Sequence, residues 1–498
     1  MHPLLYQINT RVVLTERGRE LGRPATLDDI TDEYLAGIRT LGFDWIWWMG
    51  IWQTGEIGRR IALEHPDLQA EYRRTLADFE PEDVAGSPYA VAHYYVHRDF
   101  GGNAALLRLR ERMRQLGLKL MLDFVPNHVA PDHAWVRLHP EYFVHGTEQL
   151  LATSPENYVR CQTDLGPRIL AYGRDPNYSG WTDTRQLNYR HHGFRTAAIA
   201  ELQRIATQCD GVRCDMAMLL LPDVFQRTWG DTALPADGTA PDDNSFWPLA
   251  ISKVRETFPE FVLMAEVYWD REWDLQQLGF DFTYDKRLYD RLAAGNAAGV
   301  HDHLLADGEF QRKSVRFLEN HDEPRAAAKW PFAQYKAASL VSWMIPGMRF
   351  LHEGQLTGRR IKLPVQLRRR PTEAIDLQLQ QWFMEILALL RDELPRRGRW
   401  QLLECSPAFD GNSEWRRFIV SLWTLGDRRW LVVVNLSAGP GRCYVRIPPE
   451  CLTAETVRFE DRLSSVVYDR SRADLMQRGI YFDLPEWGVH LFEFTGLA

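Results

Sequence analysis

The chain has 498 residues, of which 45% are hydrophobic and 25% are charged, and its formal net charge is −8. This length favours one large domain with at least one smaller domain, and the composition is that of a globular chain, which excludes a disordered one. The negative net charge and the dispersed basic residues exclude the electrostatic signature of a protein that binds nucleic acid or an anionic membrane.

Eight apolar runs of strand length recur along the chain, and stretches of helical periodicity separate them. The runs are LLYQINTRVVL (4–14), FDWIWWMGI (43–51), LKLMLDFVP (118–126), GVRCDMAM (211–218), FVLMAEVYW (261–269), FDFTY (280–284), SVRFLEN (314–320) and MRFLH (348–352). Continuous apolar character is typical of strands that are covered on both faces, and helices such as residues 103–117 supply the crossovers between parallel strands. The pattern predicts an α/β fold, a closed parallel (β/α)₈ barrel.

Two connections are long, residues 53–100 after the second run and residues 129–192 after the third. Long loops inside a compact domain are usually functional, and we interpret the second one as a small inserted subdomain. The segment ELPRRGRW (393–400) marks a boundary, and the strands that follow it alternate between apolar and polar residues. We therefore predict a barrel from residues 1–128 and 193–395, an inserted subdomain from residues 129–192, and a C-terminal antiparallel β-sandwich from residues 396–498.

Polar residues end four of the apolar runs, and the active site of such a barrel lies at the carboxyl ends of its strands. These residues are Asp123, Asn127 and His128 after the third run, Arg213 and Asp215 after the fourth, Glu266 after the fifth, and Asn320, His321 and Asp322 after the seventh. Any one of them alone is best explained as a solvated loop residue. Their convergence on one rim indicates an active site, although a structural ion-pair cluster is an alternative.

The spacing of Arg213 and Asp215 places both side chains on one face of a strand, while Cys214 points to the other face. A neighbouring positive charge lowers the pKa of a carboxyl group, which suits Asp215 to nucleophilic attack. Glu266 has apolar and aromatic neighbours, which would raise its pKa and keep it protonated for donation to a leaving oxygen. Two carboxylates in such different environments indicate glycoside cleavage.

Four of these segments resemble the signature regions of the α-amylase superfamily, glycoside hydrolase family 13. In order they are DFVPNH (123–128), GVRCD (211–215), AEVYW (265–269) and FLENHD (317–322). Three further segments also resemble motifs of that family, namely SPYAVAHYYVHRDFGG (87–102), QLN (186–188) and PGMRFLHEGQ (346–355). The resemblance covers essentially the whole chain.

The resemblance implies a retaining double displacement, in which Asp215 is the nucleophile, Glu266 the general acid and base, and Asp322 the third catalytic carboxylate. It also implies a carbohydrate-binding role for a set of further residues. These are Arg213, His128, His321, Tyr89, Asp123, Asn127 and Arg325. Tyr89 would offer a stacking face to a sugar ring, and Trp52, Trp181 and Trp269 belong either to that platform or to the core.

The substrate class follows from the departures from the family pattern. Met218 and Leu219 stand where endo-acting α-amylases usually carry a Lys-His pair, and HDEPR (321–325) resembles a motif of exo-acting α-glucosidases in which Arg325 would line the entrance. We expect hydrolysis of α-glucosidic bonds in oligosaccharides or α-glucans. A transglycosylase or an isomerase of the trehalose synthase type shares every catalytic residue and stays open. The intact carboxylate trio argues against a third alternative, an inactive carbohydrate-binding relative.

The resemblance implies that Asn127 stands where many members of that family help to hold a structural calcium ion. Residues 129–192 contain no acidic cluster that would complete such a site, so we expect no cofactor and no required metal. The first residues, MHPLLYQINTRVVL, lack the features of a signal peptide, and no segment is apolar enough to span a membrane. Six scattered cysteines without a C-x-x-C pair argue against a disulfide framework. We therefore expect a cytoplasmic protein, and its oligomeric state is left open.

Overall fold

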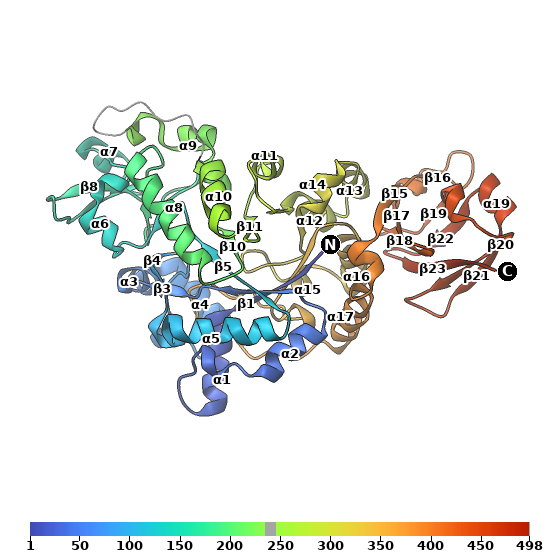
Figure 1. The fold of residues 1–498 in the computed structure, drawn as a ribbon, viewed down its shortest axis with the longest axis horizontal. Coiled ribbons are helices and arrows are strands. Elements are labelled where there is room, and N and C mark those ends of the chain that lie inside the picture. Colours follow the sequence, from blue (N-terminus) through green and yellow to red (C-terminus); the bar gives the residue numbers. More distant parts are fainter. Residues whose placement is uncertain (235–245, 498) are drawn as a thin grey trace.

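The computed structural model describes residues 1–234 and 246–497, and within them eight parallel strands close into a barrel (Figure 1). Around the barrel the strands follow the order β1, β2, β5, β10, β11, β12, β13 and β14. Their bounds are β1 (Leu4–Asn9), β2 (Trp45–Met49), β5 (Lys119–Phe124), β10 (Gly211–Cys214), β11 (Val262–Ala265), β12 (Phe282–Tyr284), β13 (Ser314–Arg316) and β14 (Met348–His352). Each strand lies within one of the eight apolar runs, so the predicted barrel is confirmed.

The first apolar run is divided between a strand and a helix. β1 ends at Asn9, and α1 (Thr10–Leu21) begins at the next residue. The Asn9 side chain accepts a hydrogen bond from the Val12 N–H, and asparagine is a favoured residue at this capping position. The strand therefore ends before residue 14, where the apolar run ends. Val12 and Leu14 continue the apolar run because they lie on the buried face of α1.

Helices cover the outside of the barrel and return the chain to the start of the next strand. They include α2 (Asp32–Thr40), α5 (Gly102–Gln115), α8 (His192–Ala206), α10 (Phe246–Thr257), α11 (Glu272–Gln277), α12 (Lys286–Ala293), α13 (Ala297–Leu304), α16 (Phe332–Trp343) and α17 (Leu377–Leu390). Because these crossovers keep the strands parallel, the carboxyl ends of all the strands meet at one rim. Within the described ranges, no helix is both long enough and apolar enough to cross a membrane.

Both long connections contain secondary structure of their own. The first forms an antiparallel pair, β3 (Trp52–Thr54) with β4 (Val91–Val96), and two helices, α3 (Glu56–Glu64) and α4 (Pro66–Thr75). The second lies at the end of the molecule opposite the C-terminus (Figure 1). It contains the short pairs β6 (His128–Val129) with β9 (Arg185–Gln186) and β7 (Tyr158–Cys161) with β8 (Arg168–Ala171), and the helices α6 (Ala134–Leu138) and α7 (Glu148–Thr153).

The C-terminal region is built from two antiparallel sheets, which confirms the predicted β domain. One sheet has the order β15 (Arg399–Leu403), β17 (Phe418–Leu425), β18 (Arg428–Asn435), β23 (Val489–Leu497), β20 (Thr456–Asp461) and β21 (Val467–Ser471). The other has the order β16 (Cys405–Pro407), β19 (Gly441–Val445) and β22 (Ile480–Leu484). Apolar residues of the two sheets form a common core. The predicted domain limits stay predictions, and their ranges include residues 235–245 and Ala498, which lie outside the described part.

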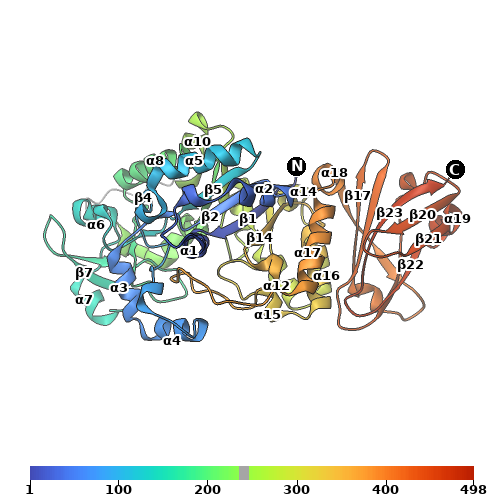
Figure 2. The ribbon, with the colours of Figure 1, turned by 90° about the horizontal axis from the view of Figure 1, so that it is seen from below.

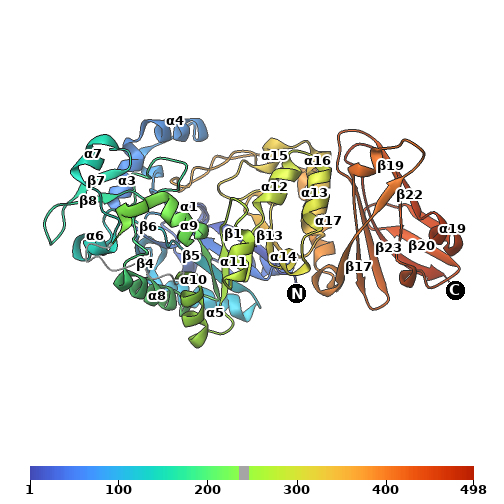
Figure 3. The ribbon, with the colours of Figure 1, turned by 90° about the horizontal axis from the view of Figure 1, so that it is seen from above.

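The larger sheet packs against the barrel through its other face. α16 and α17 lie between the barrel strands and this sheet (Figures 2 and 3). Trp423 and Trp430 are buried in the same core as the barrel residues, whereas their neighbours Leu422 and Leu431 are buried between the two sheets. This division follows from the alternation of side chains along a strand.

Candidate active site

A buried arginine contacts two carboxylates at the carboxyl ends of β10 and β11. Arg213 Nη1 contacts Asp215 Oδ1, and Arg213 Nη2 lies 2.7 Å from Glu266 Oε2. The exposed fractions of Arg213, Asp215 and Glu266 are 1%, 5% and 3%. The strand register explains the arrangement, because Cys214 pairs with Ala265 and the next residue on each strand is a carboxylate.

Aromatic rings enclose the guanidinium of Arg213. Its central carbon lies 5.3 Å from the ring centroid of Trp47, 5.2 Å from that of Tyr89 and 5.8 Å from that of Tyr284. Aromatic faces attract a guanidinium cation, and these rings also keep water away from it. The site therefore has a fixed positive charge between two carboxylates and three aromatic rings.

Glu266 accepts two hydrogen bonds inside this wall. Its Oε2 accepts from the Met216 N–H at 2.6 Å, and its Oε1 accepts from the Tyr268 hydroxyl at 2.8 Å. Burial raises the pKa of Glu266 to about 7, although the positive charge of Arg213 acts in the opposite direction. A carboxyl group with this pKa can give up a proton and take one back near neutral pH.

The backbone is strained at the residue after Asp215 and a few residues after Glu266. Met216 has a φ of 43°, and Trp269 and Asp270 have φ values of 64° and 60°. Side chains other than glycine rarely adopt this left-handed region, and such residues cluster at functional sites. At Met216 the unusual conformation accompanies the hydrogen bond from its N–H to Glu266.

Asp322 lies at the rim and is the most exposed of the three carboxylates, since 44% of its side chain is accessible. Its Oδ2 lies 3.0 Å from His321 Nε2. Desolvation raises the pKa of Asp322, but the charge and the hydrogen bond of His321 outweigh it and lower the pKa to about 2. Asp322 and Glu266 therefore differ in protonation across the weakly acidic range.

The ring of His321 is held from three sides. The side-chain amide of Gln7 lies 2.8 Å from His321 Nδ1, and the Tyr89 hydroxyl lies 2.7 Å from His321 Nε2. The rings of Tyr89 and His321 are stacked, with centroids 5.4 Å apart. Gln7 was not predicted as a site residue, and the signal that could have indicated it is a polar amide inside a mostly apolar first strand, two residues before Asn9.

Asn127 and His128 connect the barrel to the inserted segment. Asn127 Oδ1 accepts a hydrogen bond from Gln186 Nε2 at 3.0 Å, and His128 pairs with Gln186 between β6 and β9. The ring of His128 packs edge-on against Trp181 at 5.2 Å, and burial lowers its pKa. His128 therefore lies at the junction of two segments that form one wall of the site.

Asp123 and Arg325 bind other parts of the protein. The Asp123 carboxylate accepts hydrogen bonds from Trp47 Nε1 at 3.1 Å and from the Gly50 N–H at 2.8 Å, and burial raises its pKa to about 6. Arg325 is 4% exposed, and its Nη1 donates to Glu319 Oε1 at 2.8 Å. Their contact with a sugar stays a prediction, and the contacts described for both side chains are with the protein itself.

The three tryptophans have different surroundings. Trp52 is fully buried and donates from Nε1 to the Asp123 carbonyl at 2.7 Å, so it belongs to the core. Trp181 is partly buried against His128, and Trp269 is 39% exposed. Tyr268, between Glu266 and Trp269, was predicted only as an apolar neighbour, yet its hydroxyl bonds Glu266 directly.

No metal centre is found in the described part of the chain. Within those ranges, no group of three or more histidine, cysteine, aspartate or glutamate side chains could hold an ion. The amide oxygen of Asn127 accepts a hydrogen bond from Gln186.

The family model for the alpha amylase catalytic domain matches residues 25–363. An alpha-1,4-glucan:maltose-1-phosphate maltosyltransferase of Corynebacterium pseudotuberculosis is 27% identical over 261 residues, which are 51% of this chain and 31% of that protein. The alpha-amylase MalA of Haloarcula japonica is 25% identical over 365 residues, which are 72% of this chain and 44% of that protein. The chain thus spans less than half the length of these curated relatives.

A solved structure has the same fold from end to end. A maltogenic alpha-amylase, AmyB, from Thermotoga neapolitana superimposes with a TM-score of 0.68 and 18% sequence identity, and the alignment covers 100% of this chain and 99% of that one. At this identity the likeness concerns the fold alone, and it includes both the barrel and the C-terminal sheets.

Proposed function

Because the chain belongs to the alpha-amylase family, we propose that it is a retaining glycoside hydrolase that cleaves α-glucosidic bonds in oligosaccharides or α-glucans. One observation carries the proposal: the buried guanidinium of Arg213 contacts both Asp215 and Glu266. Retaining enzymes need two carboxyl groups roughly 5–5.5 Å apart on either side of the anomeric carbon. A single guanidinium that touches both carboxylates supports such a short separation.

In the first step the Asp215 carboxylate attacks the anomeric carbon, the bond to the leaving oxygen breaks, and Glu266 transfers its proton to that oxygen. In the second step the Glu266 carboxylate takes a proton from water, whose oxygen attacks the anomeric carbon and releases Asp215. Two inversions give net retention. The pKa of about 7 for Glu266 supports this alternation, because both protonation states are accessible near neutral pH.

The remaining residues would bind the sugar. Asp322, which is ionised above a pH of about 2, accepts hydrogen bonds from sugar hydroxyls at the rim. His321 and His128 contribute hydrogen bonds from two sides, and Tyr89 presents its ring to the sugar face. Arg213 holds the Asp215 carboxylate in position by direct contact.

The test is a panel of maltose, isomaltose, trehalose, sucrose and maltooligosaccharides, with the first-formed anomer followed by proton NMR. We expect α-configured products from the wild type and none from Asp215→Asn. First products of β configuration would contradict the retaining mechanism. Turnover by Asp215→Asn at the wild-type rate would exclude Asp215 as the nucleophile.

Rescue of variants by azide distinguishes the roles of the two carboxylates. The substrates are α-glucosyl and α-maltosyl fluoride, because fluoride leaves without the help of an acid. In Asp215→Gly, azide replaces the missing nucleophile and attacks from the opposite face, so β-glycosyl azide is expected. In Glu266→Ala, Asp215 still forms the glycosyl-enzyme, and azide then attacks it to give α-glycosyl azide. If both variants give the same anomer, the assignment of the two roles is wrong.

Glycosyl transfer is the second candidate, and curated relatives named as maltosyltransferases favour it. The nucleophile and the acid would act as before, but a sugar hydroxyl would replace water in the second step. Maltose 1-phosphate with a maltooligosaccharide acceptor tests this directly. Phosphate release with lengthening of the acceptor would indicate a transferase, whereas release of maltose without lengthening would indicate a hydrolase.

We also propose that the chain works in the cytoplasm. All six cysteines carry free thiols, and five of them are buried. Unpaired thiols are typical of a reducing compartment, whereas secreted proteins use cysteines mainly in disulfides. Fractionation of the source cells with an antibody against the chain tests this location.

A further inference from the structure

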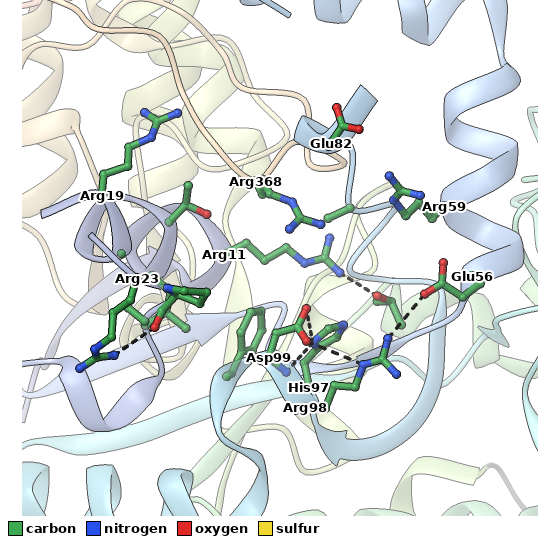
Figure 4. A pocket seen from close by; sticks show the side chains of 18 of the residues that line it. Arg11, Arg19, Arg23, Glu56, Arg59, Glu82, His97, Arg98, Asp99 and Arg368 are labelled. Atoms are coloured by element: carbon green, nitrogen blue, oxygen red, sulfur yellow. Dashed lines mark hydrogen bonds and ion pairs between the residues drawn. The ribbon is translucent and has the colours of Figure 1, made fainter. Parts of the chain in front are cut away.

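A cavity of about 870 Å³ lies outside the candidate active site, between α1, the start of α3 and the segment that contains Arg368 (Figure 4). None of the three candidate catalytic carboxylates lines it. The segment of residues 82–89 runs from one place to the other, because Glu82 and Ala85 line the cavity while Tyr89 stacks on His321 in the candidate active site.

Arginines dominate the cavity wall. The side chains of Arg11, Arg59 and Arg368 point into the cavity from three separate segments of the chain (Figure 4). Arg19, Arg23 and Arg98 also line it. Of these, Arg23 is neutralised by two hydrogen bonds to Asp29, and Arg98 has only loose contacts, at 3.9 Å from Glu56 and 3.7 Å from Asp99.

The three converging arginines have no carboxylate partner among the residues that the structure describes. Arg11 donates to the Gly86 carbonyl and to Thr54 Oγ1, and Arg59 donates to the carbonyls of Val84 and Pro81. The Nε of Arg368 is buried without any hydrogen-bond partner. These contacts orient two of the guanidiniums. Of the acidic residues that line the same cavity, Glu56 and Asp99 lie beside Arg98, and Glu82 pairs with none of the three arginines among the described residues.

Such an arrangement is costly without an anion. Arg11 is only 5% exposed, and buried charges in proteins are normally paired. Burial and the neighbouring charge of Arg368 lower the pKa of Arg11 to about 10, which is the response expected of like charges forced together out of water. A ligand with negative charge would remove both penalties.

We propose that this cavity binds a small phosphorylated organic molecule, with its phosphate between Arg11, Arg59 and Arg368. The planar guanidinium fork matches phosphate oxygens, which is why arginine is common in phosphate sites. Leu14, Ala25 and Phe100 line the cavity beside the arginines and offer apolar contacts to the organic part of the ligand. The volume is in the usual range of small-molecule sites. The site is independent of the proposed hydrolase chemistry.

Isothermal titration calorimetry on the full chain tests the proposal, with glucose 6-phosphate, fructose 1,6-bisphosphate and adenosine 5′-diphosphate as probes. We expect at least one probe to bind at a single saturable site and more tightly than inorganic phosphate or unphosphorylated glucose. Failure of all three probes to bind would overturn the proposal. If inorganic phosphate binds as tightly as every probe, the proposal that the ligand has an organic part is wrong.

Two substitutions with the same charge change locate the site. Arg368→Gln removes a guanidinium without a partner at Nε, and we expect about tenfold weaker binding of the probe. Arg23→Gln removes a guanidinium that Asp29 already neutralises, and we expect a change within about twofold. Equal effects of the two substitutions, or no effect of Arg368→Gln, would place the bound probe elsewhere. Arg59→Gln provides a second variant if Arg368→Gln does not fold, and circular dichroism checks the folding of each.

Discussion

At the residue scale, the surroundings of Glu266 and His321 could be predicted from the sequence only in part. The sequence indicated an apolar environment for Glu266, and burial does raise its pKa to about 7. The sequence did not indicate the donors to Glu266 or the amide of Gln7 that holds His321. Gln7 and His321 are separated by more than three hundred residues, and their contact exists only because the barrel closes between its first and last strands.

The pH dependence of activity should report the pKa of Glu266. Only the protonated form can donate to the leaving oxygen, so we expect kcat/KM to fall as the pH rises through about 7. Asp322 stays ionised throughout, because its pKa is about 2. Initial rates on the best substrate of the panel, measured from pH 4 to pH 9, check this limb. A profile that stays flat up to pH 9 would show that Glu266 is not the acid.

Tyr268→Phe should move this limb toward higher pH. The Tyr268 hydroxyl donates to Glu266 Oε1, and a hydrogen bond to a carboxylate favours its ionised form. Loss of a bond worth about 1 kcal/mol would raise the pKa of Glu266 by roughly half a unit to one unit. A variant that loses activity equally at every pH would show a structural role only. Tyr142→Phe serves as the control, because Tyr142 lies in the inserted segment between β6 and β9 and its ring packs against Trp135 and Phe194.

At the element scale, the strands were more predictable than their connections. All eight apolar runs contain a barrel strand, because a strand buried on both faces needs continuous apolar residues. The strand within the run at residues 4–14 is shorter than predicted. A run of apolar residues alone cannot distinguish a strand from the buried face of a helix, and here the helix cap at Asn9 sets the boundary. The helices α3 and α4 in the long first connection were not predicted.

Gln186→Met should destabilise the junction between the barrel and the inserted segment. The substitution keeps the side-chain length but removes the amide that donates to Asn127, whose oxygen is then buried without a partner. We expect the free energy of unfolding to fall by about 1–3 kcal/mol, measured by urea denaturation with circular dichroism. The control is Gln115→Met, which removes an exposed hydrogen bond to Glu111 on α5. Equal losses in both variants would contradict the role of the buried bond.

At the scale of the whole molecule, the barrel and the larger C-terminal sheet share one hydrophobic core. The sequence predicted a boundary at residues 393–400, and the antiparallel sheets do follow it. It did not predict how the sheet would pack. The signal was present in β17 and β18, since FIVSLW and WLVVV are apolar on both faces and an ordinary sandwich strand needs only one apolar face.

Trp423 tests whether this shared core makes the two parts unfold together. Its ring is fully buried, and its Nε1 donates to the Met344 carbonyl, beyond the end of α16, at 2.8 Å. Trp423→Ala would leave a cavity at the junction and lower the free energy of unfolding by about 3–5 kcal/mol.

Trp415→Ala is the matched control, because Trp415 is only partly buried at the edge of the core between the two C-terminal sheets. A smaller loss is expected there. In the wild type, we expect urea to cause a single unfolding transition, with the same midpoint by circular dichroism and by the loss of activity. The contradicting result is that Trp423→Ala shifts only part of the circular dichroism signal and leaves the urea midpoint for loss of activity unchanged. That result would show that the barrel is stable without the sheet and that the shared core does not couple the two parts.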